Sequence, residues 1–466
     1  MTLKSTGRVL KRLGLGGLAL VTLALIALLA VNRNDRPPSP AAQQMLALYQ
    51  QRTPVPLDEN GYVFAMGFDA AQDEDPRHVG ADRIAWYNER LAKPGAELLD
   101  EPARNVYDPD AHRSDAIQKL LELCKSPQRP CADALTAHEQ AVALYVGNEA
   151  WRLTRYRALL ANRQWELTMT PGLRMAFPPY GSVLDAQKLL FLKVWLLAGK
   201  GDVRQIKALL SADISFWRTA LASSDVLIDK LIASVALDRH FAFAQLVLRR
   251  LPGEQSILAV PAAWYEPFSR DELSMKRVFA GEWMFVESFI QGMARDPDEF
   301  PILGDAFVER TVGERMIDRL ASHLLQPQDA LNQQAEFLLR LAAAMDVPLE
   351  SVPQALLKVS AMEGEMAGLP LKPYNPTGTY LVAKDSRNYT QYAIRVMDLE
   401  GVRRAALLTA QIRSQGVKYN EVGKRLADCV LRNPYDATSF GWNARAGTVE
   451  YVGLASGERG HHALLY

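Results

Sequence analysis

The sequence lacks an excess of charge of either sign. Among its 466 residues, 53 are lysine or arginine and 53 are aspartate or glutamate, so the formal net charge at pH 7 is zero. A nucleic-acid-binding surface needs a basic excess to neutralise phosphates. The composition therefore argues against a nucleic-acid partner. Its charged and hydrophobic fractions of 23% and 48% are those of an ordinary globular protein.

Common catalytic motifs are also missing. We find no G-x-S-x-G elbow, no S-x-x-K nucleophile motif and no phosphate-binding loop. His138 and Glu139 begin a pattern like that of a zinc protease, but Val142 stands where the second histidine would be. A Ser-His-Asp site assembled from distant positions stays open, because it has no local motif. We predict no cofactor and no metal site, and we favour a protein that is not an enzyme.

Only one apolar run has the length of a membrane span. Residues 13–31 carry no charge, and Thr22 is their single polar side chain. Such a run spans the roughly 30 Å hydrocarbon layer as a helix. The residues before it are basic and include no acid (Lys4, Arg8, Lys11 and Arg12). By the positive-inside rule, the N-terminus is cytoplasmic and the bulk of the chain crosses the membrane.

We predict an uncleaved, single-pass signal anchor in a bacterial inner membrane, with the residues after the anchor in the periplasm. A cleaved signal peptide is the alternative. The end of the apolar run has no A-x-A cleavage site, which argues against it.

Cysteine is scarce, with three in the whole chain. Cys124 and Cys131 flank a short loop stiffened by two prolines, and no other cysteine or histidine pair lies near enough in sequence to complete a zinc site. In an oxidising compartment such a pair forms a structural disulfide. Cys429 is left over. On a helix it would share one face with Val422, Leu426 and Val430, which favours a buried, inert thiol over an intermolecular link.

Apolar residues three and four apart recur through most of the chain and predict helices. A Gly-Lys-Gly-Asp turn at 199–202 predicts a tight helical hairpin in which Asp202 caps the second helix. The aromatic and β-branched residues around 443–447 predict a terminal β-hairpin. We therefore expect a mainly α protein, with a transmembrane helix, an irregular helical bundle or solenoid-like periplasmic domain, and a small C-terminal β-hairpin. The expected ranges are a cytoplasmic tail (1–12), the anchor (13–31), a stalk rich in proline (32–55), a mostly helical region with the disulfide (56–181), a helical hairpin array (182–368) and C-terminal helices with the hairpin (369–466).

Two acidic residues are candidate catalytic groups. Asp225 and Asp229 are four residues apart, which makes them neighbours if both lie on one helix. Asp225 also falls on an expected apolar stripe (Trp217, Leu221, Ile228, Ile232 and Val235). A buried carboxylate needs partners, and the nearby candidates are Arg218, Lys230, Arg239 and His240. One hypothesis is a polar clamp between helices. The other is an acid/base pair with His240, of the kind hydrolases use.

Three stretches carry a resemblance to a known family. They are DISFWRTALASSDVLIDKLIASVAL, RVFAGEWMFVES and the closing NPYDATSFGWNARAGTVEYVGL. Together with the anchor and the cysteine pair, they resemble uncharacterised single-pass envelope proteins of proteobacteria. The resemblance covers most of the chain and implies no activity. The tail departs from the pattern at Ala437, near which a glycine is expected.

These observations predict a membrane-anchored periplasmic protein that is not an enzyme and acts as an interaction or scaffold module for another envelope protein. Arrays of helical hairpins offer broad surfaces suited to that role. The first alternative is a periplasmic hydrolase that uses Asp225 and Asp229. The second is an inhibitor of an envelope-targeting toxin.

Overall fold

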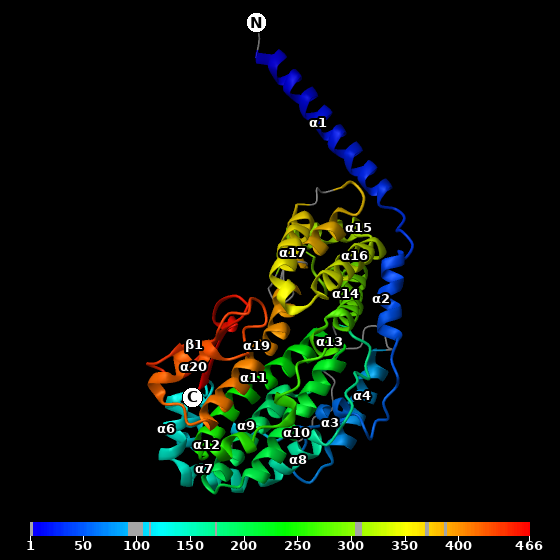
Figure 1. Cartoon of the computed structure of the whole chain (residues 1–466). Coiled ribbons are helices and arrows are strands. Elements are labelled where there is room, and N and C mark those ends of the chain that lie inside the picture. Colours follow the sequence, from blue (N-terminus) through cyan, green and yellow to red (C-terminus); the bar gives the residue numbers. More distant parts are fainter. Residues whose placement is uncertain are drawn as a thin grey trace. The chain divides into compact units, whose positions relative to one another are not determined.

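The computed structural model describes residues 3–91, 106–110, 113–172, 175–302, 310–368, 372–385 and 389–466. The chain is mainly helical with a small C-terminal antiparallel sheet, as predicted (Figure 1). The helices are α1 (Leu3–Val31), α2 (Pro40–Gln50), α3 (Gly61–Met66), α4 (Pro76–Leu91), α5 (Asp115–Leu123), α6 (Arg129–Ala137), α7 (Glu139–Asn148), α8 (Ala150–Leu160), α9 (Tyr180–Gly199), α10 (Val203–Ser223), α11 (Leu227–Arg250), α12 (Gly253–Leu258), α13 (Arg270–Leu273), α14 (Lys276–Arg295), α15 (Val312–His323), α16 (Pro327–Met345), α17 (Val352–Ala367), α18 (Pro376–Asp385), α19 (Tyr389–Ser414) and α20 (Val422–Asp428). The strands are β1 (Gly441–Asn443), β2 (Thr448–Val452) and β3 (His461–Leu465).

The chain forms two compact units, each built from separate stretches. Unit 1 comprises residues 1–50, 283–341 and 358–388, and unit 2 comprises residues 51–282, 342–357 and 389–466. Each unit draws residues from several of the ranges expected from the sequence. Helices α14, α16 and α17 each contribute to both units.

In unit 1, the segment after α1 is bonded to the domain. Asn32 is buried, its amide donates to Pro373 O at 2.7 Å, and its side-chain oxygen accepts from Asn375 N at 2.7 Å. The Asp35 carboxylate accepts hydrogen bonds from the first backbone N–H groups of α16, at 2.6 Å from Gln328 and 3.1 Å from Asp329. A carboxylate at that position is favoured by the helix dipole. The expected stalk thus begins with a strap that is held against α16, followed by helix α2.

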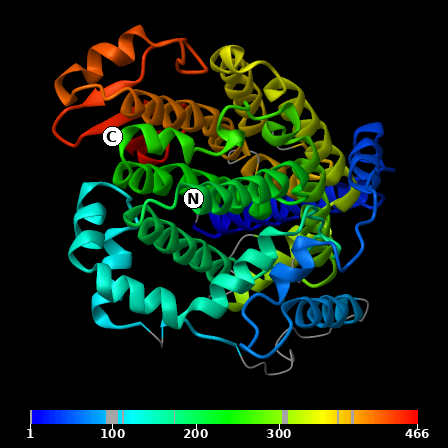
Figure 2. The ribbon, with the colours of Figure 1, turned by 60° about the horizontal axis from the view of Figure 1, so that its bottom comes forward.

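Unit 2 is organised around α11, which contacts α9, α10 and α19 (Figure 2). Helix α11 is long and apolar enough to cross a membrane. However, 67% of its most apolar 18-residue stretch is buried inside the protein. Helix α9 supplies a nearly continuous apolar run of buried side chains. The predicted α9–α10 turn is confirmed: Gly201 has φ +68°, and Asp202 accepts from Gln205 N at 3.1 Å. Glycine suits that left-handed conformation because it has no Cβ.

Two details of the α10–α11 region differ from the prediction. Helix α10 ends at Ser223, and both Ser224 and Val226 are extended, so Asp225 lies in a turn and not on a helix with Asp229. The hydroxyl of Ser224 donates to Ala220 O, the kind of local bond by which serine competes with a helix. The expected apolar stripe also breaks here, since Ile228 and Val235 are exposed.

The prediction of a helical face around Cys429 is wrong beyond Leu426. Val422 and Leu426 are buried, but α20 ends at Asp428, Cys429 is extended and half-buried, and Val430 is 95% exposed. The interpretation of Cys429 as a fully buried thiol therefore does not hold.

The predicted C-terminal hairpin is confirmed as β1 and β2, which pair antiparallel around Gly447. A third strand was not expected: β3 pairs antiparallel with β2 and completes the order β1-β2-β3. Because β3 also contacts α11 and α19, the chain end is packed into unit 2. Ala437 has φ +57°, so the expectation of a glycine near it corresponds to a left-handed backbone.

Candidate functional site

Asp225 is a clamp between distant segments. Its Oδ1 accepts from Arg277 Nε at 2.6 Å, and its Oδ2 lies 3.1 Å from Arg52 Nη1. The same Oδ2 accepts from the backbone N–H of Leu167 at 3.3 Å. The carboxylate is 1% exposed and its charge is balanced by two guanidinium groups. Neither arginine was among the partners expected from the sequence.

Helix α14 fits closely over this turn. A Cβ added to Gly281 would lie 1.8 Å from Asp225 O, so only glycine allows this approach. The next residue, Glu282, accepts from Leu227 N at 2.7 Å. Its carboxylate thus binds an N–H group in the first turn of α11, where the helix leaves such donors unsatisfied. These contacts fix the helix start, and they give Asp225 a structural role.

Asp229 has a different environment, although it is only four residues away. Its Oδ1 accepts from the Tyr180 hydroxyl at 2.5 Å. Burial raises the pKa of Asp229 to about 7, and the nearby charge of Asp225 adds to this effect, while the Tyr180 hydrogen bond opposes it. The next residue, Lys230, is also buried and donates to Leu221 O at 2.7 Å. Burial lowers the pKa of Lys230 to about 7.

His240 belongs to a second buried network. Its Nε2 accepts from Trp264 Nε1 at 3.0 Å, and Trp264 can only donate. The remaining ring nitrogen, Nδ1, is therefore the donor to Asp213 Oδ2 at 2.8 Å. The other oxygen of Asp213 accepts from the Tyr156 hydroxyl at 2.6 Å. Since His240 and Asp213 are 0% exposed and both ring nitrogens are occupied, this imidazole has no free position for a substrate proton.

The candidate residues therefore do not form one site. Asp229 and His240 are eleven residues apart on α11, which corresponds to about 16 Å along the helix axis. Each is enclosed in its own set of partners, and no cluster of three or more potential metal-ligating side chains occurs among the residues that the structure describes. Asp225, Asp229 and His240 each bond to their own partners, and these bonds stabilise helix packing.

Two acidic residues that organise unit 2 were not predicted from the sequence. Asp213 joins α8, α10 and α11 through the network above, and it also accepts from the side-chain amide of Gln187 on α9 at 3.2 Å. Asp398 on α19 accepts from the Tyr435 hydroxyl at 2.8 Å and from the backbone N–H groups of Leu454 and Ala455 at 2.9 Å each. It thereby ties α19 to the C-terminal segment. A signal was available, because both acids stand within apolar stretches, LLSADISFW and RVMDLEG.

A surface groove lies between α7, α8 and α9. Its volume is about 540 Å³, and its walls are mostly apolar (Ala143, Val146, Gly147, Leu153, Leu196 and Leu197). No atom lies within 4 Å of a Cβ added to Gly147, so a longer side chain there would enter open space. Lys193 and Lys200 line the same groove, and neither forms an ion pair within the described part of the chain. Glu139 at its edge is paired with Arg250 at 2.8 Å. The groove therefore combines apolar walls with positive charge.

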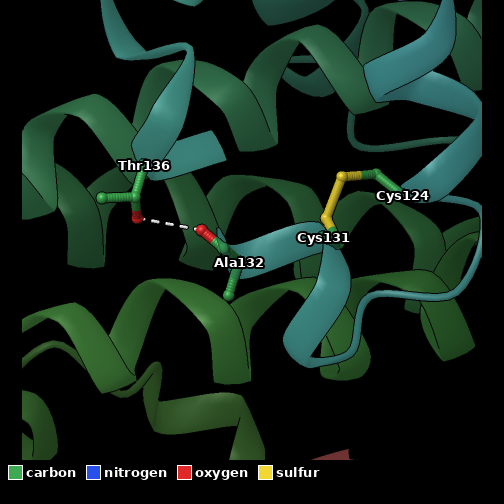
Figure 3. Close-up of a disulfide and its surroundings, with 4 residues drawn as sticks. All are labelled: Cys124, Cys131, Ala132 and Thr136. Atoms are coloured by element: carbon green, nitrogen blue, oxygen red, sulfur yellow. Dashed lines mark hydrogen bonds between the residues drawn. A yellow bond between two sulfur atoms is a disulfide. The ribbon is translucent and has the colours of Figure 1, made fainter. Parts of the chain in front are cut away.

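The cysteine pair lies close to this groove in sequence. Cys124 ends α5 and Cys131 lies in the first turn of α6, and the structure joins them in a disulfide with Cα atoms 4.8 Å apart (Figure 3). Both are buried. Beside them, the Thr136 hydroxyl donates to Ala132 O at 2.9 Å within α6. The bond holds the α5–α6 turn closed, as predicted for a structural disulfide.

Comparison with known proteins gives no match to any family model, to a curated protein or to a solved structure. The resemblance to envelope proteins stays a prediction.

Proposed function

We propose that this protein is a single-pass inner-membrane protein of a bacterial envelope, with its N-terminus in the cytoplasm, that binds another envelope protein in the periplasm. Helix α1 is the anchor in this proposal, and the α7–α9 groove is the interaction surface. The observation that carries the proposal is the apolar surface of α1.

Large apolar side chains cover α1 and contact little of the protein. Six of them are between 57% and 69% exposed (Leu15, Leu18, Leu20, Val21, Leu23 and Ile26). A monomeric water-soluble protein rarely exposes so large a contiguous apolar patch. A lipid bilayer supplies the apolar surroundings that such a helix needs. The basic residues that precede the run support a cytoplasmic N-terminus.

The strap after α1 supports a fixed attachment. Asn32 is bonded to Pro373 and Asn375, and Asp35 caps α16. An anchor joined in this way restricts how unit 1 is presented to its surroundings. Restricted orientation lowers the entropy that is lost when a partner binds.

The groove supports a partner of defined chemistry. Its apolar walls suit one face of an amphipathic helix, and Lys193 and Lys200 suit acidic residues beside that face. Complementary charge steers association and discriminates against other partners. The Cys124–Cys131 disulfide is consistent with an oxidising compartment for this region. No observation in the structure favours the hydrolase or the toxin-inhibitor alternative.

The test is chemical crosslinking in intact cells, followed by purification of the full-length protein and mass spectrometry. The decisive variant is Gly147→Leu, which fills the groove without touching the core. Its control is Gly364→Leu on α17, because Gly364 also has no atom within 4 Å of an added Cβ. Both changes replace a helical glycine and are expected to stabilise the helix by about 0.5 to 1 kcal/mol.

The proposal expects one reproducible envelope partner with the natural chain and with Gly364→Leu, and its loss with Gly147→Leu. Reversing the rim charge with Lys193→Glu and Lys200→Glu should weaken capture in the same way, whereas Lys119→Glu and Lys207→Glu should not. Capture of the same partner by every variant would reject the groove. Recovery of the protein alone under all conditions would reject the interaction role itself.

A further inference from the structure

Helix α15 in unit 1 carries an apolar stripe that the described part of the protein leaves uncovered. Val312, Met316 and Leu320 are spaced four residues apart and are 66%, 67% and 40% exposed. Ile317 lies beside them and is 54% exposed. Residues at this spacing lie on one side of a helix. Such a face needs an apolar surface to cover it.

The opposite side of α15 is the one that packs on the protein. Asp318 is 1% exposed, accepts from Ile302 N at 3.2 Å, and is paired with Arg310 at 2.9 Å. At 3.6 residues per turn, Asp318 points about 160° away from Met316 around the helix axis. The helix is therefore held by one side, and its apolar stripe faces outward.

The end of α15 is fixed close to the end of α1. Ala321 O accepts from the Thr377 hydroxyl at 2.8 Å. Three residues after α15 ends, Gln326 donates through its side chain to Asn32 O at 2.5 Å. The same Gln326 is bonded through its backbone N–H to Asn375 at 2.9 Å, and Asn375 is bonded to Asn32. One set of contacts within unit 1 thus joins the last turn of the anchor to the end of α15.

Basic and aromatic side chains surround this junction. The guanidinium of Arg36 lies 4.7 Å from the centre of the Tyr374 ring, and Arg33 and Lys372 are exposed nearby in sequence. Arg315 on α15 is exposed and forms no ion pair among the described residues. Aromatic residues and long basic side chains are typical of the membrane–water interface, where they reach the headgroups.

We propose that α15 lies in the headgroup boundary of the bilayer that α1 spans, with its apolar stripe toward the acyl chains. This inference rests on the proposed membrane anchoring. Interfacial helices have this combination of an apolar face and basic polar flank. Two contacts with one membrane, α1 and α15, then set the orientation of unit 1 on the bilayer surface.

The test uses full-length protein with Cys429→Ser, reconstituted in vesicles of phosphatidylethanolamine and phosphatidylglycerol. A fluorescent, environment-sensitive label is placed at Met316→Cys, and quenching by nitroxide-labelled lipid is measured. Ala27→Cys in α1 is the positive control for the anchor. Leu144→Cys on α7 in unit 2 is the negative control, matched to Met316 in exposure at 64% against 67%. The disulfide stays oxidised during labelling.

We expect several-fold stronger lipid quenching at position 316 than at position 144, together with strong quenching at position 27. Quenching at position 27 alone would overturn the role of α15 and leave the anchor in place. Absence of quenching at position 27 would overturn the anchor and the inference with it. A label at position 316 that is shielded from water but not quenched by lipid would indicate a protein contact and would also overturn the inference.

Discussion

Helices α1 and α11 each contain a long apolar stretch, and these stretches have opposite surroundings. Residues Leu15–Val31 of α1 are apolar and mostly exposed, whereas α11 has a mean hydropathy of 1.4 over its most apolar window and is largely buried. The difference lies in the polar residues. Helix α11 contains Asp229, Lys230 and His240, each bonded to a partner in unit 2, whereas no charged residue occurs in residues 13–31.

Length and hydropathy alone favour α11 as a membrane span, and they therefore do not identify the proposed anchor. Buried charges with protein partners identify α11 as a core helix, because in lipid such groups are costly. The exposed apolar surface of α1 is the reason for proposing it as an anchor, because water is an unfavourable solvent for such a surface.

The largest expected effect comes from placing a charge on each helix. Ala236→Asp buries an unpaired carboxylate in α11, where Ala236 is 0% exposed, and should cost more than about 4 kcal/mol or prevent folding. Ala24→Asp in α1 should leave the denaturant midpoint in detergent unchanged and reduce membrane integration, since an acid in mid-span costs about 2.5 to 3.5 kcal/mol. Equal unfolding by the two variants would remove the distinction between the helices.

The Asp213 network tests the interior of unit 2. Asp213→Ala leaves the buried donors of His240, Tyr156 and Gln187 without their acceptor, and we expect a loss of about 3 to 5 kcal/mol. Chemical denaturation measures this change. Asp238→Ala is the matched control: its side chain is 44% exposed and paired with His462, so the expected loss is at most about 1 kcal/mol. Similar losses for the two variants would argue against a network.

Asp229 and Lys230 predict opposite effects of pH on stability. The pKa of Asp229 is raised to about 7, so the unfolded chain releases this proton first, and stability falls as pH rises from about 4 to 7. The pKa of Lys230 is lowered to about 7, so the folded chain releases that proton first, and stability rises between about pH 7 and 10. Each change in the free energy of unfolding is on the order of 4 kcal/mol.

The variants Asp229→Asn and Lys230→Met separate these contributions. The first should remove the decline between about pH 4 and 7, and the second should remove the rise between about pH 7 and 10. Denaturation at several pH values provides the curves. Identical pH dependence in the natural chain and both variants would show that neither group changes its pKa on folding.

The disulfide is expected to have a smaller effect, because it acts on a short loop outside the α11 networks. Cys124→Ser should lower stability by about 2 to 3 kcal/mol in oxidising buffer, since the bond restricts the unfolded loop. Thermal unfolding with and without reductant measures this. Cys429→Ser is the control and should unfold as the natural chain does. A melting temperature that is insensitive to reductant would contradict a stabilising role.

Sequence patterns predicted the structural features that depend on residues close to one another in the chain. The Gly201–Asp202 turn, the hairpin at Gly447 and the cysteine pair depend on neighbouring residues, and each was found where expected. The partners of Asp225 were not predictable in this way. Arg52 lies 173 residues before it and Arg277 lies 52 residues after it, so only the folded chain brings them together.

The same distinction explains the strap and the third strand. Asn32 and Asp35 lie in a polar, proline-rich segment that is typical of a linker. Their partners Asn375 and Gln328 are hundreds of residues away, so the sequence did not indicate that this segment is bonded to the domain. His461–Leu465 resembles a tail until β2 provides backbone partners for it. The groove had no local signal either, because Gly147 and Lys193 come from different helices.

The most direct test of the account is membrane flotation after alkaline carbonate extraction from intact cells. The full-length chain is compared with residues 32–466 exported by a cleavable signal, so that only α1 is removed. We predict that the full-length chain floats with the membranes and that the shortened chain is released into the soluble fraction. A shortened chain that still floats after carbonate would place a membrane span elsewhere, with α11 as the first candidate, and would contradict the account.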